Sequence, residues 1–167
     1  ANGSYARRQR ATDLMRLLFT GGGGSATEAL WRFWQDRYEL HFADADEAAI
    51  CPVIPVGRRH AIPFAVEPGY NDALAALCRR MEIDLLIPGV DEELPHIPAI
   101  LSAAPDLIAL CPDPAYVETM CDKLATARAL SKAGLDSPRT ETLDEADSMG
   151  FPCVLKPRLG RGSRGFH

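Results

Sequence analysis

The hydrophobic pattern alternates short apolar runs with segments of helical spacing over residues 14–112. Four apolar runs predict buried strands, at residues 14–20, 38–46, 83–89 and 106–112. Apolar positions at helical spacing predict helices between them, marked by Leu30, Phe33 and Trp34, by Leu74, Leu77, Cys78 and Met81, and by Ile97, Ile100 and Leu101. Strands that alternate with helices predict an α/β fold with a Rossmann-like parallel sheet.

The pattern changes after Pro112. A helical segment is expected from Asp113 to Gly134, where the glycine suits a helix C-terminus. Short extended pieces, a polar helix around 144–149 and an apolar strand over 151–157 follow. We therefore expect four regions, with a second domain of α+β type at the end: 1–13, disordered or an expression-derived N-terminus; 14–112, the Rossmann-like domain; 113–137, a helical connection; and 138–167, the incomplete start of the second domain.

Composition restricts the partners and the cellular compartment. The chain is 47% hydrophobic and 25% charged, which is typical of a globular protein, and its net charge of -5 argues against a nucleic-acid or membrane-surface partner. No apolar run is long enough to span a bilayer. The five cysteines include no C-x-x-C pair and no compact group with histidine, so we expect free thiols, no metal site formed by them, and a cytoplasmic location.

The glycine run Gly21–Gly24 stands between the first strand and the first helix. Ser25 and Glu28 form a capping-box pattern, and backbone N–H groups at such a helix N-terminus can bind an anion. The dinucleotide fingerprint requires a third glycine where this chain has Thr27, although Asp44 lies 20 residues past Gly24, as a ribose-binding acid would. Three interpretations stay open: a nucleotide site, a site for a substrate carboxylate or phosphate, and a tight turn without a ligand.

Two acidic residues, Glu92 and Glu93, follow the third predicted strand. Open α/β sheets bind ligands at this edge, so these carboxylates are candidates for substrate binding. They are equally suited to stabilise the N-terminus of the next helix.

Lysine is rare, with three residues against fifteen arginines. Lys132 suits a helix C-terminus, whereas Lys123 follows Asp122 at a predicted helix start. Lys156 lies in the last apolar run and precedes a loop rich in glycine and arginine, "GRGSRG". A lysine on a strand beside such a loop is a reasonable phosphate clamp. The alternative is an edge strand with an outward lysine and a flexible loop.

The order of these pieces resembles the ATP-grasp family, and within it the members like carbamoyl-phosphate synthase and biotin carboxylase. The resemblance rests on "DK", a helix ending in "AG", then "GFP", "LKP" and "GRGSRG", and on "IDLLIPGVDEEL" earlier in the chain. It covers residues 14–167. It implies that residues 14–112 form the pre-ATP-grasp domain and that residues 138–167 begin the ATP-grasp domain.

The resemblance implies an ATP-dependent ligase that activates a carboxylate as an acylphosphate, which an amine or ammonia then attacks. ATP and Mg²⁺ would be the cofactors, with the metal ligands downstream of this chain, and a homodimer is compatible with it. The implied ATP-binding residues are Lys123, Lys156, Gly160, Gly162, Ser163, Arg164 and Gly165. The substrate side would include Gly22, Gly23, Gly24, Ser25, Glu92 and Glu93.

The resemblance identifies no catalytic residue, and we expect the 167-residue chain alone to be inactive. Two other functions remain open. One is a non-catalytic module that binds a nucleotide or another small molecule. The other is an NAD(P)-dependent oxidoreductase built on the first glycine run.

Overall fold

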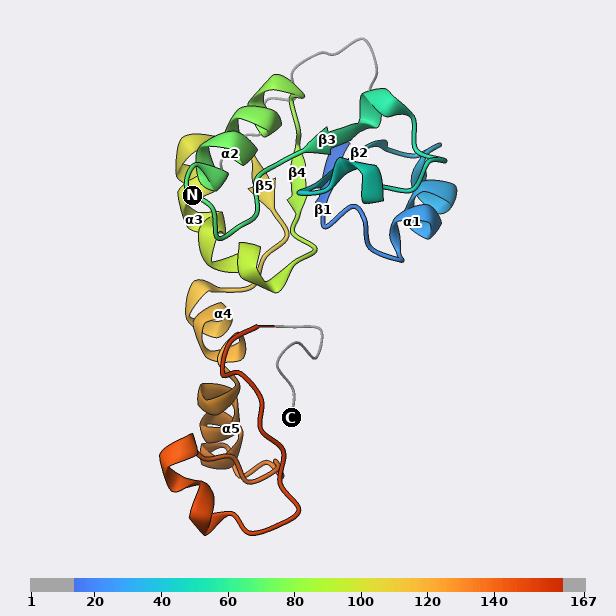
Figure 1. Cartoon of the computed structure of the whole chain (residues 1–167). Coiled ribbons are helices and arrows are strands. Elements are labelled where there is room, and N and C mark those ends of the chain that lie inside the picture. The colour runs from blue at the N-terminus through green and yellow to red at the C-terminus, as the bar shows by residue number, and fades with distance from the viewer. Residues whose placement is uncertain (1–13, 161–167) are drawn as a thin grey trace.

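A five-stranded parallel sheet is the centre of the fold in the computed structural model, which describes residues 14–160 (Figure 1). The strands are β1 (Arg16–Thr20), β2 (Glu39–Asp44), β3 (Arg59–Ala61), β4 (Leu85–Ile87) and β5 (Ile108–Ala109). Their order is β3-β2-β1-β4-β5, and every neighbouring pair is parallel. The α/β fold class with a Rossmann-like parallel sheet is confirmed. The predictions for 1–13 and for Gly162, Ser163, Arg164 and Gly165 lie outside the described residues.

Helices cover both faces of the sheet (Figure 1). α1 (Thr27–Trp34) packs on one face, and α2 (Tyr70–Arg80) and α3 (Ile97–Ala103) pack on the other. Three 3-10 turns connect these elements: η1 (Glu47–Ala49), η2 (Val56–Arg58) and η3 (Asp91–His96). Within residues 14–160, no helix is both long and apolar enough to cross a membrane.

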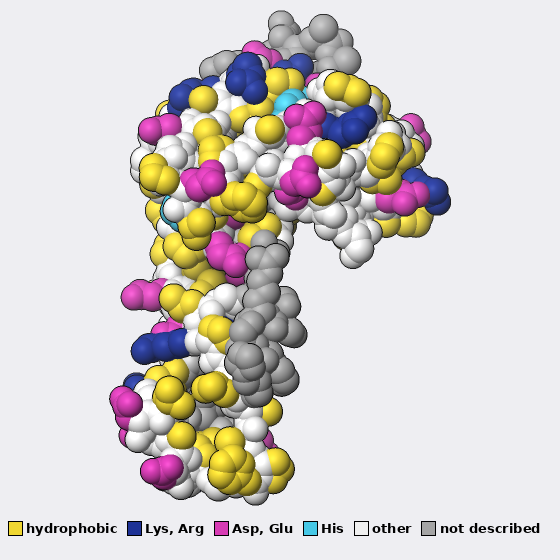
Figure 2. All heavy atoms as spheres, in the orientation of Figure 1, with side chains coloured by type: hydrophobic (Ala, Val, Ile, Leu, Met, Phe, Trp, Pro, Cys, Tyr) yellow, Lys and Arg dark blue, Asp and Glu magenta, His cyan; other side chains and the backbone are white. Residues whose placement is uncertain are grey.

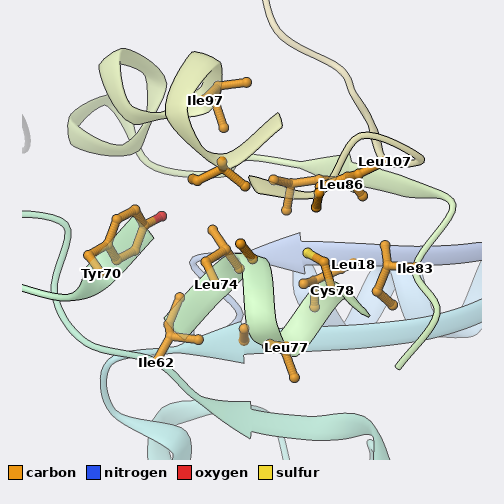
Figure 3. Close-up of a cluster of buried hydrophobic side chains, with 14 residues drawn as sticks. Leu18, Ile62, Tyr70, Leu74, Leu77, Cys78, Ile83, Leu86, Ile97 and Leu107 are labelled. Atoms are coloured by element: carbon orange, nitrogen blue, oxygen red, sulfur yellow. The ribbon is translucent and has the colours of Figure 1, made fainter. Parts of the chain in front are cut away.

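Alternation along the strands divides the core into two clusters. Leu18 and Leu86 point to the α2 side, where they meet Leu74 and Ile100 (Figure 3). Leu17, Phe19 and Phe42 point to the other side, where the partly buried Leu30 and Trp31 of α1 pack against them. Because both faces are buried, these strands read in the sequence as continuous apolar runs.

Residues 113–160, which we call the extension, leave the sheet as a narrow column (Figures 1 and 2). It contains α4 (Pro114–Met120), α5 (Lys123–Lys132) and the 3-10 turn η4 (Leu143–Ser148). The Asp113 and Asp122 side chains cap the two helices, so the single predicted helical segment is two helices. Gly134 has a φ of 71°, as expected of a glycine that ends a helix.

Two sequence predictions for local structure are wrong, and one strand was not predicted. Ser25 does not cap α1, whose N-cap residue is Ala26 without a side-chain hydrogen bond, because Gly24 and Gly21 close the preceding turn through their own backbone. No strand forms over 151–157, because no ladder partner lies beside it among the described residues. β3 was not expected, since its residues are polar and follow a proline-rich stretch.

Candidate functional site

The first glycine run makes a tight turn whose N–H groups bind the protein itself. Gly22 N donates to Ala43 O at 2.9 Å, and Gly24 N donates to Gly21 O at 2.9 Å. Gly23 N donates to the carboxylate Oδ2 of Asp44 at 2.8 Å. A ribose-binding acid would use its carboxylate to bind the sugar. In this structure, the Asp44 carboxylate instead accepts a hydrogen bond from the glycine turn.

Packing explains why these positions are glycine. A Cβ on Gly22 would lie 3.1 Å from Cβ of Phe42, and one on Gly23 would lie 2.8 Å from Cβ of Ala49. The turn thus fits against β2 and η1 only without side chains. These contacts favour the interpretation of a tight turn over that of a dinucleotide fingerprint.

Glu93 is a buried acid that binds the end of β1. It is 4% exposed, and its carboxylate accepts a hydrogen bond from the Thr20 hydroxyl, which is also buried. The same hydroxyl accepts a hydrogen bond from Gly89 N at 3.0 Å. Glu93 lies in the first turn of η3 and thereby connects η3 to the carboxyl ends of β1 and β4.

Tyr70 adds a buried phenol near this carboxylate. Its side chain is 1% exposed, and its hydroxyl has no hydrogen-bond partner of good geometry among the described residues. Burial, with the charge of Glu93 as a further cause, raises the pKa of Tyr70. The phenol therefore stays protonated beside the acid.

The acidic residues of η3 adjoin the junction of α4 and α5. Cys121 at this junction lies 4.0 Å from the backbone oxygen of Asp91, measured from Sγ. Burial, followed by the negative charges of Asp91 and Glu92, raises the pKa of the Cys121 thiol. The predicted substrate residue Glu92 therefore lies at the same edge of the sheet as the start of α5.

Segments far apart in the sequence meet at the N-terminus of α5. The Lys123 ammonium donates to Gly160 O at 2.7 Å, and Lys123 N donates to Arg158 O at 3.1 Å. Arg158 also forms an ion pair with Asp122. The hydrogen bond from Arg158 lowers the pKa of Asp122 to about 2. The structure thus brings together two of the predicted ATP-binding residues, Lys123 and Gly160.

Other predicted residues are placed differently. Lys156 is exposed in an irregular segment, two residues before Arg158. Ser25 is exposed in the first glycine turn, which belongs to the sheet region. Asp122 and Arg158 were not predicted as site residues, although an acid directly before Lys123 was a usable signal. No group of three or more His, Cys, Asp or Glu residues within residues 14–160 could hold a metal ion.

A second polar cluster lies at the amino end of β2. Burial alone would raise the pKa of Glu39, but the hydrogen bonds and charges of Arg58 and Arg16 lower it to about 2. His41 is 1% exposed, and burial, the Arg58 charge and the neighbouring His60 lower its pKa to about 4. Arg58 Nη1 lies 2.8 Å from His41 Nε2, and His41 Nδ1 lies 2.9 Å from His60 Nε2. Nε2 also lies 3.5 Å from Glu39 Oε1, but arginine can only donate, so the shorter contact with Arg58 favours a neutral His41 ring with its proton on Nδ1.

Comparisons with known proteins place the fold. No protein-family model matches the chain. The uncharacterized protein y4rH of Sinorhizobium fredii is 33% identical over 137 residues, which cover 65% of this chain and 28% of that protein. The chain therefore spans less than a third of the length of this curated relative.

Two solved structures share the architecture. Pyruvate carboxylase of Rhizobium etli superposes with a TM-score of 0.60 at 14% identity, over 92% of this chain and 15% of the other. The biotin carboxylase domain of Hydrogenobacter thermophilus 2-oxoglutarate carboxylase, in complex with MgADP, ADP and bicarbonate, superposes with a TM-score of 0.60 at 16% identity, over 93% of this chain and 38% of the other. At this identity the likeness concerns the fold.

Proposed function

We propose that this chain is the N-terminal portion of an ATP-dependent ligase of the ATP-grasp type. The ligase would activate a carboxylate as an acylphosphate for attack by an amine or ammonia. The pre-ATP-grasp region would be residues 14–112, with the ATP-grasp domain beginning at residue 138. The similarity in fold to a biotin carboxylase domain that binds MgADP and bicarbonate supports this class of reaction.

The observation that carries the proposal is the contact between α5 and residues 158–160. Lys123 comes from a helix start and Gly160 from a segment 37 residues away, yet the ammonium and the carbonyl are 2.7 Å apart. A lysine beside a glycine-rich segment combines a mobile positive charge with backbone that can approach a phosphate closely. Both are requirements for binding a triphosphate.

In the proposed site, Lys123 and Lys156 neutralise the charge of the ATP phosphates. Gly160 would begin the loop over them, and Gly162, Ser163, Arg164 and Gly165, which lie outside the described residues, would belong to the same loop. Phosphoryl transfer depends mainly on such positioning and charge neutralisation. Mg²⁺ would neutralise further charge on the phosphates, and we expect its ligands outside the described residues.

The substrate side is proposed at the carboxyl edge of the sheet. The N–H groups of Gly22, Gly23 and Gly24 are occupied by the protein, so the glycines would shape this surface more than bind to it. Ser25 is exposed and Glu92 is partly exposed, which leaves both able to contact a substrate. The buried Glu93 would hold η3 against the end of β1 through its hydrogen bond with Thr20. We also propose that the protein forms a homodimer.

Calorimetric titration of the chain with MgATP and with NADH tests the function. We expect MgATP to bind and Lys123→Ala to weaken it about tenfold or more, since a hydrogen bond to a charged group contributes roughly 1.5–3 kcal/mol. Lys132→Ala is the matched control, because Lys132 lies at the opposite end of the same helix. Its affinity for MgATP should equal that of the unaltered chain.

Two results would contradict the proposal. One is an affinity for NADH above that for MgATP, which would favour an oxidoreductase. The other is an unchanged MgATP affinity after Lys123→Ala. If a longer form of the protein bound MgATP without releasing ADP in the presence of any carboxylate and amine, the protein would be a binding module.

A further inference from the structure

The Asp122 carboxylate has two sets of partners at the start of α5. Its Oδ1 accepts hydrogen bonds from Leu124 N at 3.0 Å and from Ala125 N at 3.1 Å, which caps the helix. Arg158 Nε lies 2.8 Å from the same Oδ1 and 2.6 Å from Oδ2, and Arg158 Nη2 lies 2.5 Å from Oδ2. One carboxylate therefore joins the helix to a residue 36 positions further on.

Two hydrogen bonds from Lys123 fix the direction of the same segment. Lys123 N donates to Arg158 O, and the Lys123 ammonium donates to Gly160 O. Gly160 has a φ of 106°, a conformation that residues with a side chain rarely adopt. Residues 158–160 therefore lie along the helix start in one defined orientation.

We propose that Asp122 and Arg158 are a positioning pair that holds residues 158–160 at the N-terminus of α5, so that Lys123 and the backbone of Gly160 meet the phosphates of one nucleotide. The inference rests on the proposed function and names residues of that same site. Neither Asp122 nor Arg158 needs to touch the nucleotide. They act by fixing the distance between the groups that do.

The need for such a pair follows from the surroundings of the segment. All residues from 151 to 160 are exposed, and none of them belongs to a helix or a strand. Without an anchor, binding a phosphate would have to order this segment, at a cost in conformational entropy. On binding, phosphate oxygens would replace Gly160 O as the partner of the Lys123 ammonium, while the ion pair stays in place.

Asp122→Asn separates positioning from simple electrostatics. Asparagine caps helices as well as aspartate does, so α5 should keep its start. Removing a negative charge beside a polyphosphate should strengthen binding if only charge matters. If the ion pair positions the loop, the same substitution should weaken binding, because Arg158 loses its charged, two-oxygen partner.

The experiment is a calorimetric titration of the 167-residue chain with MgATP and with tripolyphosphate. The variants are Asp122→Asn, Arg158→Gln, the double variant and Arg158→Lys. We expect each single variant to bind both ligands about three- to tenfold more weakly, as for a site whose competent state is populated only in part. The double variant should be no weaker than the worse single variant, and Arg158→Lys should recover part of the affinity.

Arg32→Gln is the control, since Arg32 forms an exposed ion pair with Glu28 on α1. It should bind both ligands like the unaltered chain, and thermal unfolding should show that all variants are folded. An affinity of Asp122→Asn equal to or above that of the unaltered chain would overturn the positioning role while leaving the proposed function intact. If the unaltered chain bound neither MgATP nor tripolyphosphate, the proposed function and the pair's role would both fail.

Discussion

The backbones of Gly89 and Thr20 lie close together at the sheet edge. A Cβ on Gly89 would lie 2.3 Å from Thr20 O, which is closer than two nonbonded atoms can come. The Thr20 hydroxyl also accepts the Gly89 N–H and donates to Glu93. The glycine after β4 is therefore needed to bring these two strand ends into contact.

Gly89→Ala should destabilise the protein strongly. The new methyl group would collide with backbone that cannot move aside easily, so we expect a loss of about 3 kcal/mol or more in the free energy of unfolding. Urea unfolding followed by circular dichroism measures it. Gly57→Ala is the control, because a Cβ there has no heavy atom within 4 Å. Equal stability of the two variants would contradict the steric argument.

At the scale of elements, β2 and β3 are joined by a polar cluster as well as by their ladder. His41 on β2 and His60 on β3 are in hydrogen-bond contact, and Arg58 just before β3 binds both Glu39 and His41. Burial is the largest cause of the lowered pKa of His60. The charge of Arg80 on α2 lowers this pKa further, whereas the charge of Glu47 in η1 raises it. Protonation of these histidines at low pH should therefore weaken the contact between β2 and β3 first.

The pH dependence of stability tests this cluster. The pKa of His41 is about 4 in the folded protein, below its ordinary value of 6.5, so the unfolded chain takes up the proton first as the pH falls. The contribution of His41 to the free energy of unfolding should be fully present above pH 6.5. It should decline toward pH 4, by up to roughly 3 kcal/mol. Glu39, at about 2 against 4.5, adds a further loss below pH 4.5.

Urea unfolding at several pH values between 7 and 4 measures this decline. His41→Gln should reduce the slope between pH 6.5 and 4, because residue 41 then takes up no proton, while the lowered pKa of His60 leaves part of the slope. His96→Gln should keep the slope, since His96 pairs with Asn71 away from the cluster. A slope that His41→Gln leaves unchanged would exclude His41 as its source.

The sequence predicted the elements whose burial is simple. β1, β2 and β4 are mostly buried runs, β5 is a short apolar run, and α2 and α3 carry their buried residues at helical spacing, so composition and periodicity suffice for them. β3 escaped prediction because its polar residues belong to the histidine–arginine cluster. The strand expected around Lys156 failed because apolar residues form a strand only beside a partner strand.

The candidate site was predictable in part, for similar reasons. Lys123 and Gly160 were selected because "DK" and "GRGSRG" resemble the motifs of a known family, and the two residues are in contact in the structure. Arg158 was one of fifteen arginines, and only the fold brings it to Asp122. Glu93 could not be distinguished from Glu92, since the geometry of η3 alone decides which of the two is buried.

At the scale of the whole molecule, the described chain has a well-packed region and a thinly packed one. Among residues 113–160, Val117 and Leu124 are the buried ones, whereas the sheet region contains both apolar clusters. Large apolar side chains are exposed near the end of the extension, among them Phe151 at 95% and Leu143 at 70%. Local opening should therefore concentrate in the extension.

Limited proteolysis tests this uneven stability. Chymotrypsin should cut first after Leu143 or after Leu159, which is 63% exposed, and should leave the sheet region intact, because cleavage requires locally opened backbone. Mass spectrometry of the fragments over time identifies the order of cuts. Phe42, which is fully buried in β2, is the internal reference. Cleavage after Phe42 as early as after Leu143 or Leu159 would contradict the expected order.

The two outer strands of the sheet are short: β3 has three residues and β5 has two. The outer edge of a sheet presents unpaired N–H and C=O groups, which can recruit strands of other molecules into aggregates. Edges of this length offer few such groups in a row. The protein can therefore bury a strongly apolar centre in β1, β2 and β4 and still resist the growth of its sheet from one molecule to the next.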